Sequence, residues 1–321
     1  MIAQQVQKGN DNIMKILVTG GSGFVGRNLT ESLVKNGNEV TITSTGAEPI
    51  IPGVKKVLYM SLEGIDWDKV HGYDVLVHQM ANNDTRCQDE KEMFRANVDG
   101  PIKLFNSVVD GGCKNIVYAS STAVYGSEPA PYIEGVTPVR PLNVYGRSKA
   151  KFDEFAMQFA EDRKVKVTGL RYCNVYGPGE DQKGKRMSMI GQILRGMLAH
   201  KRPKLFEPGD QKRDWIYVKD VVKINYQAIA RLPQETWGRI YNTGSGTAVT
   251  FNEIVHTINA LMCGKAPWPI QPEYIPCPFS AEYQNHTECN IEKARRELGF
   301  TPGYDLRTGI WDYLKSLTDA S

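Results

Sequence analysis

The chain has 321 residues, of which 41% are hydrophobic and 23% charged, and its formal net charge is +3. This composition is typical of a globular protein with one large or two modest domains, and the small net charge argues against binding to nucleic acid or to a membrane surface. No apolar run approaches the roughly 18 residues that a membrane span needs.

The 6 cysteines are scattered and include no Cys-x-x-Cys pair. They therefore predict neither a metal site nor a disulfide framework, and reduced thiols in the cytoplasm are expected. Residues 1–13 are polar and lack the apolar core of a signal peptide, so we expect a disordered leader and a fold that begins at Met14.

A glycine-rich loop follows the first expected strand, Lys15–Thr19, and a helix to Asn36 follows the loop. Gly20 permits the tight turn, Gly23 lets the backbone approach a pyrophosphate, and Gly26 lets the helix pack against the strand. The spacing is Gly-x-x-Gly-x-x-Gly, and its place between strand and helix predicts a dinucleotide site. We assign to the cofactor the residues of this loop, Gly20, Gly23, Phe24, Val25 and Gly26.

The second strand, Val40–Thr43, ends in Ser44 and Thr45, where an acidic residue would favour NAD. A hydroxyl does not repel the 2′-phosphate of NADP, but no arginine stands beside it to bind that phosphate. The cofactor is therefore NADP or NAD, with a slight preference for NADP. Ser61 and Leu62, after the third strand at 57–60, are expected beside the adenine.

The fourth strand, Val75–His78, is followed by small and polar residues. Such residues at the carboxyl end of a parallel strand lie where open sheets bind ligands. We assign Met80 and Ala81 to the cofactor and Asn82 to the substrate. In the next expected helix, Glu92–Val109, Asn97 either faces solvent or anchors the backbone beside the site.

A tyrosine and a lysine, Tyr145 and Lys149, stand four residues apart on an expected helix that extends to Arg163. A buried ammonium beside a phenol favours the phenolate, which predicts a lowered pKa for Tyr145. Such a tyrosine takes a proton from an alcohol while a hydride leaves the same carbon. Ser121, at the end of the fifth strand (115–119), would bond the substrate oxygen. Taken singly, the pair can be two surface residues and the serine part of a turn.

The alternation of six strands with helices, the last strand being Val167–Arg171, predicts an α/β fold with a doubly wound parallel Rossmann sheet. We place a dinucleotide-binding domain at 14–172. Residues 173–321 are richer in Gly, Pro and charge at their start and are expected to form a smaller α+β substrate domain, interleaved with the first. Arg213, after a Gly-Asp turn, suits a second pyrophosphate or is a surface arginine.

The set Gly20/Gly23/Gly26, Ser121, Tyr145 and Lys149 resembles the extended short-chain dehydrogenase/reductase superfamily, in its NAD-dependent epimerase/dehydratase family, over nearly the whole chain from Met14. Members act on nucleotide-diphosphate sugars with a tightly held NAD(P). The second half is most similar to the ADP-glycero-manno-heptose 6-epimerases, in the stretches 171–184, 203–207, 212–220 and 283–288.

This resemblance implies roles for further residues. Lys183, after Asn-Val-Tyr-Gly-Pro, would be a second acid/base, and Lys149 would also reach the nicotinamide ribose. Val175 is assigned to the cofactor. The residues assigned to the substrate are Asn82, Thr122, Asn174, Lys185, Phe206, Arg213 and Tyr283. Two departures from the family stand out. Cys173 replaces the usual phenylalanine, and the second-strand end and the 79–83 loop differ from those of the best-known members.

The expected reaction is epimerisation: transient oxidation to a keto sugar, then return of the hydride to the opposite face. The alternative is a 4-epimerase of an NDP-hexose or NDP-uronate, with Tyr145 as the single base. A 4,6-dehydratase is disfavoured because Thr122-Ala123 stands where an acid pair is needed, and a non-catalytic nucleotide-binding protein is disfavoured because Tyr145 and Lys149 are present. The resemblance also implies a homodimer through the helices at 92–109 and 145–163, with Phe152, Phe155 and Phe159 as the contact stripe.

Overall fold

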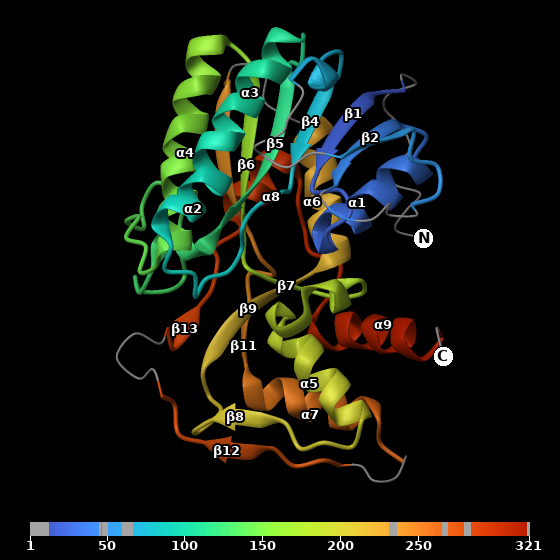
Figure 1. Cartoon of the computed structure of the whole chain (residues 1–321). Coiled ribbons are helices and arrows are strands. Elements are labelled where there is room, and N and C mark those ends of the chain that lie inside the picture. The colour runs from blue at the N-terminus through green and yellow to red at the C-terminus, as the bar shows by residue number, and fades with distance from the viewer. Residues whose placement is uncertain are drawn as a thin grey trace.

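A parallel sheet forms the centre of the larger lobe (Figure 1). The computed structural model describes residues 13–44, 46, 51–59, 67–230, 236–264, 269–278 and 284–319, and within these the sheet has seven strands in the order β10-β6-β5-β4-β1-β2-β3. All their pairings are parallel. The strands are β1 (Lys15–Thr19), β2 (Glu39–Ser44), β3 (Lys56–Tyr59), β4 (Val75–His78), β5 (Asn115–Ser121), β6 (Lys166–Tyr172) and β10 (Gly238–Thr243).

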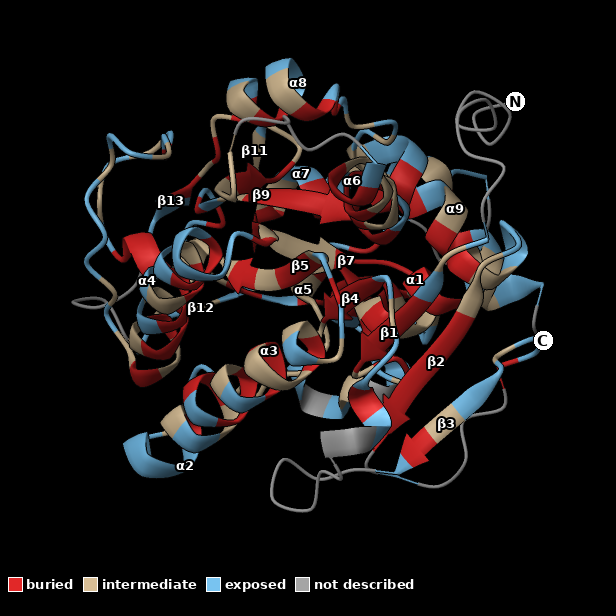
Figure 2. Cartoon of the chain, turned by 90° about the horizontal axis from the view of Figure 1, so that it is seen from above, coloured by how far each residue is buried: buried red, intermediate tan, exposed pale blue. Residues whose placement is uncertain are grey.

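The central strands of the sheet are buried on both faces, as Figure 2 shows. Ile16, Leu17 and Val18 of β1 are fully buried, because helices cover the sheet on each side. One face carries α1 (Phe24–Lys35), α6 (Val218–Ala230) and α8 (Glu292–Leu298), and the other carries α2 (Glu90–Phe94), α3 (Gly100–Asp110) and α4 (Val144–Arg163). The predicted Rossmann fold is therefore confirmed.

The seventh strand, β10, was not predicted. It comes from the second half of the sequence, as do α6 and α8, so the chain leaves the sheet after β6 and returns to complete it. Its sequence, GRIYNT, lacks the continuous apolar run that is typical of a central parallel strand. In the structure, three of its six residues are buried.

The smaller lobe lies at the carboxyl ends of the sheet strands (Figure 1). Strand β9 (Lys212–Tyr217) pairs with three short strands, β7 (Asn174–Tyr176), β11 (Ala248–Thr250) and β13 (His286–Thr287), and β8 (Lys204–Phe206) pairs with β12 (Glu273–Ile275). Its helices are α5 (Met189–Leu198), α7 (Phe251–Leu261) and α9 (Leu306–Thr318). The described chain also has short 3₁₀ segments in both lobes: η2 (Trp67–Val70), η4 (Thr122–Tyr125) and η5 (Glu180–Arg186).

The helix expected at 92–109 is divided into α2, a π-helical turn η3 (Arg95–Asp99) and α3. Asn97 lies in the π-helical turn and is buried. Such turns are common beside functional sites, because they redirect one side chain out of the helical register.

The phenylalanine stripe of α4 packs inside the chain. Phe152 and Phe159 are buried with Phe105 and Tyr118 against the sheet, and Phe155 packs on the same cluster. The stripe therefore gives no support to a dimer contact, contrary to the expectation from the sequence. In the described part of the chain, no helix has the length and apolar character needed to cross a membrane.

Candidate active site

A cavity of about 920 Å³ opens where the sheet strands end and the smaller lobe begins. Its wall includes the loops after β1 and β4, the carboxyl ends of β2, β5 and β6, the start of α4, β7 and η5. The cavity brings together most of the predicted site residues: Gly20, Gly23, Phe24, Val25, Gly26, Ser44, Met80, Ala81, Ser121, Tyr145, Lys149, Asn174, Val175 and Lys183.

The glycine loop between β1 and α1 has the geometry predicted for it. Gly20 has φ +67°, and a Cβ there would lie 2.9 Å from the backbone of Met80. At Gly26, a Cβ would collide with the carbonyl of Gly20, so only glycine lets α1 begin so close to β1. The first turn of α1 contains no acidic residue, and Gly23 offers no capping side chain. Its backbone N–H groups are thus suited to a diphosphate, which fits a dinucleotide cofactor.

The end of β2 presents hydroxyl groups to the cavity. Ser44 is buried and its Oγ lies 3.1 Å from the Oγ of Ser22, while the N–H of Gly20 donates to Thr43 Oγ1 at 3.1 Å. Neutral hydroxyls here are compatible with either a ribose or its 2′-phosphate. Four predicted site residues, Thr45, Ser61, Leu62 and Tyr283, lie outside the described residues, and the side chain of Lys185 is not described.

Three of the predicted catalytic residues converge at the start of α4. Asn143 caps this helix by accepting a hydrogen bond from the N–H of Gly146 at 2.8 Å, which fixes where it begins. Lys149 Nζ donates to the carbonyl of Ala119 at 2.9 Å and lies 5.9 Å from the ring centre of Tyr145. The Tyr145 hydroxyl is hydrogen-bonded by Ser121.

Burial is the largest influence on the pKa values of Tyr145 and Lys149. It raises the pKa of Tyr145, and the hydrogen bond from Ser121 only partly opposes this effect. The prediction of a lowered tyrosine pKa is therefore wrong for the chain alone, because loss of hydration, together with the nearby carboxylate of Asp153, outweighs the Ser121 hydrogen bond. Burial also lowers the pKa of Lys149 to about 8, against the attraction of Asp153.

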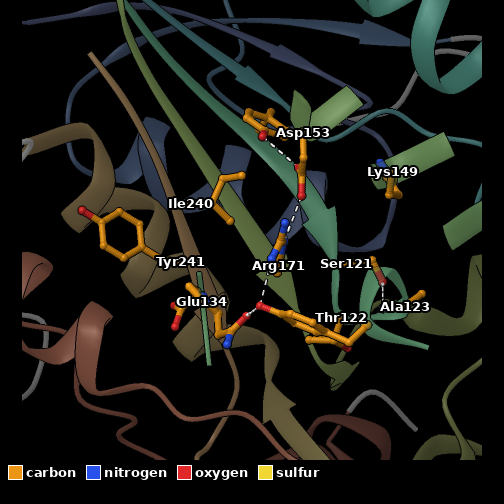
Figure 3. Close-up of polar contacts among 12 residues, drawn as sticks. Ser121, Thr122, Ala123, Glu134, Lys149, Asp153, Arg171, Ile240 and Tyr241 are labelled. Carbon is orange, nitrogen blue, oxygen red and sulfur yellow. Dashed lines mark hydrogen bonds and ion pairs between the residues drawn. The ribbon is translucent and has the colours of Figure 1, made fainter. Parts of the chain in front are cut away.

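A buried ion pair, missed by sequence reasoning, holds α4 in place (Figure 3). Arg171 Nε donates to Asp153 at 2.9 Å, and the hydroxyl of Tyr118 donates to the same carboxylate at 2.8 Å. Arg171 also bonds the hydroxyl of Tyr125, which donates to Asn242 of β10 at 2.7 Å. This chain of contacts ties the helix that carries the candidate catalytic pair to β6 and β10. The signal in the sequence was an acidic residue four positions after Lys149.

Replacing Asp153 with asparagine is expected to lower the free energy of unfolding by about 3–5 kcal/mol, because the guanidinium of Arg171 stays buried without its counter-charge. Glu154→Gln is the matched control, since its partner Lys151 is solvent-exposed and the pair contributes little. Denaturant titration of both variants measures the difference. Equal stability of the two variants would contradict the importance of the buried pair.

Lys183 reaches the cavity from η5. The buried carboxylate of Glu180 fixes this segment by accepting hydrogen bonds from the N–H and Oγ of Ser188, at 2.7 and 2.8 Å. Lys183 Nζ lies 5.2 Å from the ring centre of Phe24. Burial lowers the pKa of Lys183; Glu180 opposes the shift and Arg186 adds to it. An amine with a lowered pKa is suited to exchange protons.

Five predicted site residues do not line the cavity. Asn97 instead holds the loop after β4, since its amide accepts from the N–H of Asn82 at 2.8 Å and donates to the carbonyl of Asn82 at 2.9 Å. Thr122 donates to the carbonyl of Tyr172 at 3.2 Å. Phe206 lies in β8 of the smaller lobe, and Arg213 in β9 donates to the carbonyl of Lys212.

Other residues line the cavity without having been predicted. Tyr172 does so with its hydroxyl already bonded to Gln79 at 3.2 Å and to Asn225 at 2.9 Å. Arg186 does so while donating to Asn83 at 3.1 Å. Cys173 stands directly before Asn174, and Trp215 stands two positions after Arg213. The signal for Cys173 was its departure from the family pattern.

The family profile described as "NAD dependent epimerase/dehydratase family" matches residues 16–244. The chain belongs to this family. A curated relative, the ADP-L-glycero-D-manno-heptose-6-epimerase of Alkalilimnicola ehrlichii, is 32% identical over 95% of this chain and 98% of its own. The solved structure of the Helicobacter pylori enzyme of the same name is 33% identical, with a TM-score of 0.84 over 96% of this chain and 98% of its own.

A second solved structure contains a bound nucleotide sugar. The protein MoeE5, in complex with UDP-glucuronic acid and NAD, is 27% identical, with a TM-score of 0.84 over 96% of this chain and 100% of its own. These similarities confirm the family and the fold predicted from the sequence, and with them the prediction of a nucleotide-sugar epimerase.

Proposed function

We propose that the chain epimerises a nucleotide-diphosphate heptose at carbon 6. The observation that carries the proposal is the presence of two proton-exchanging side chains, Tyr145 and Lys183, on the wall of one cavity. The similarity to heptose 6-epimerases in two comparisons supports the choice of sugar. We assign the cofactor to residues 14–172 and the sugar chiefly to 173–321.

In the proposed mechanism, Tyr145 or Lys183 removes the proton of the sugar hydroxyl. Held at the glycine loop, a dinucleotide would supply the hydride acceptor for this oxidation and the hydride donor for the return step. Ser121 bonds the substrate oxygen. The ammonium of Lys149, 5.9 Å from the ring centre of Tyr145, favours the phenolate against burial, which raises the pKa of Tyr145. The planar keto sugar turns within the cavity so that the hydride returns to its other face, and the opposite base delivers a proton to the sugar oxygen. Asn174, which lines the cavity, would hold the sugar.

We expect the protein to purify with NAD or NADP already bound, because an enzyme that recovers the same hydride gains from retaining its cofactor. The hydroxyls of Ser22 and Ser44 accept either nucleotide, while the family description and the NAD-bound MoeE5 favour NAD. Mass spectrometry of the nucleotide released on denaturation shows whether a cofactor is bound and whether it is NAD or NADP. Cofactor-free protein that carries out net reduction of NADP by an alcohol would indicate an ordinary dehydrogenase.

The substrate is tested with ADP-glycero-manno-heptose, following the configuration at carbon 6 by nuclear magnetic resonance. A panel of ADP-, UDP-, GDP- and dTDP-sugars in thermal-shift measurements ranks the nucleotide, since a bound ligand raises the apparent stability. Inversion at carbon 4 of a UDP-hexose or UDP-uronate, with no reaction of the heptose, would favour the 4-epimerase alternative. The known complex of MoeE5 with UDP-glucuronic acid is the observation behind that alternative.

Two further predictions from the sequence remain proposals. A homodimer rests on the family resemblance alone, now that the phenylalanine stripe is buried, and sedimentation at micromolar concentration measures it. A cytoplasmic location rests on the expectation of reduced thiols, and fractionation of cells that express the protein tests it.

A further inference from the structure

Two cysteine thiols are in contact beside the cavity. The Sγ atoms of Cys173 and Cys289 lie 2.7 Å apart, although the residues are 116 positions apart in the sequence. Both side chains are buried, but Cys173 is one of the residues that line the cavity. The proposed epimerase mechanism uses neither thiol.

The backbone holds both residues in place. The N–H of Cys173 donates to the carbonyl of Thr243 at 2.8 Å, and the N–H of Cys289 donates to Asp214 at 3.2 Å. On either side of Cys289, Glu288 and Asn290 exchange backbone hydrogen bonds with Tyr132, at 2.8 and 2.9 Å. The contact between the two sulfurs is therefore built into the fold.

The group formed by Cys173, Cys289 and Asp214 is poorly suited to bind a metal ion. The carboxylate of Asp214 lies with the two thiols in a group of three possible ligands. It already accepts four hydrogen bonds, from the N–H and Oγ of Ser245 and from the N–H groups of Gly246 and Cys289. Two thiolates on one tetrahedral zinc, with Zn–S bonds of about 2.3 Å, stand about 3.7 Å apart, well beyond the observed separation.

We propose that Cys173 and Cys289 form a disulfide when a hydroperoxide enters the cavity. The sulfur of Cys173, as thiolate, attacks the peroxide, the O–O bond breaks, and a sulfenic acid and an alcohol or water result. The sulfur of Cys289 then attacks the sulfenic sulfur and water leaves. In sum, two thiols lose two protons and two electrons, and the peroxide is reduced. A disulfide needs a sulfur separation of about 2.05 Å, so the bond forms with a small movement.

The surroundings set the rate of this reaction. Burial and the nearby Asp214 raise the pKa of the Cys173 thiol, and burial raises that of Cys289. Charged and titratable groups that act on the pair from neighbouring elements include Asp214, Glu134 and Arg171. The thiolate is the reactive form, so oxidation is slow at neutral pH and accelerates as pH rises.

Peptide mapping tests the proposal on the protein as purified. After hydrogen peroxide treatment, the protein is denatured, free thiols are blocked with N-ethylmaleimide, and it is digested without reduction. We expect one cross-linked peptide pair containing Cys173 and Cys289, lost after dithiothreitol. Because the bond closes a long loop, Tm should rise by about 5 °C or more.

Two variants control the experiment. Cys289→Ser should abolish both the cross-link and the rise in Tm. Cys113→Ser should leave both unchanged, because the buried thiol of Cys113 bonds backbone carbonyls, among them those of Asp74 and Asn115. If a variant fails to fold, the peptide map of the wild-type protein still shows whether Cys173 and Cys289 form the disulfide.

Two results would overturn the proposal. One is full labelling of Cys173 and Cys289 after a treatment that oxidises the exposed Cys263. The other is one equivalent of zinc in the purified wild type, absent from Cys289→Ser, which would make the group a metal site. No activity is measured, so failure of the epimerase proposal leaves this test intact.

Discussion

Replacing Tyr145 with phenylalanine is expected to lower kcat by at least about 10²- to 10⁴-fold, the contribution of one positioned acid/base. The change removes a single hydroxyl from the cavity, together with its hydrogen bond to Ser121, and leaves the glycine loop intact. Cofactor content should therefore stay at the wild-type level. Steady-state kinetics and the mass of the released nucleotide measure the two quantities.

Tyr172→Phe is the matched control for this variant. It deletes the same atom in the same cavity, but the Tyr172 hydroxyl is occupied by hydrogen bonds with Gln79 and Asn225. We expect a much smaller loss of kcat. Near-normal turnover in Tyr145→Phe, or an equal loss in both variants, would remove Tyr145 from the proton transfer and with it the mechanism.

Replacing Lys183 with methionine separates the two epimerase mechanisms. If Lys183 is the second base, proton transfer on one face loses its donor, and kcat should fall by about 10²- to 10⁴-fold with little change in KM. If Lys183 only binds diphosphate, KM should rise and kcat should stay largely intact. The variant should still reduce an aldehyde analogue through the face that Tyr145 serves.

Lys183→Arg and Arg186→Met sharpen the comparison. An arginine keeps the positive charge but does not give up its proton near neutral pH, so Lys183→Arg should retain KM and lose kcat. Arg186 lines the same cavity, and its loss should affect binding alone. Full kcat in Lys183→Met would exclude the two-base mechanism and favour a single-base 4-epimerase.

Local patterns in the sequence were sufficient for the fold class and for much of the site. Gly20 and Gly26 could be assigned roles because each role depends on backbone space within a few residues of the chain. The pair Tyr145 and Lys149 could be recognised because a helix fixes the relation of residues four apart. Alternating strands and helices imply a parallel sheet, and the carboxyl ends of its strands mark the site.

Contacts between distant segments were decided only in the tertiary structure. Loss of hydration at Tyr145 comes from the packing of several segments around it, and it reversed the predicted direction of its pKa. Arg213 and Phe206 were assigned by their position in a motif, but neither β8 nor β9 brings these two residues into the cavity wall.

Some contacts correspond to no local sequence pattern, and only the tertiary structure reveals them. The ion pair of Asp153 with Arg171 joins a helix to a strand, and the thiols of Cys173 and Cys289 meet across 116 positions of sequence. Strand β10 is recognisable as part of the sheet only through its pairing with β6. The sequence by itself determined what short-range sterics and periodicity control, whereas burial, charge pairing and register depend on which distant segments pack together.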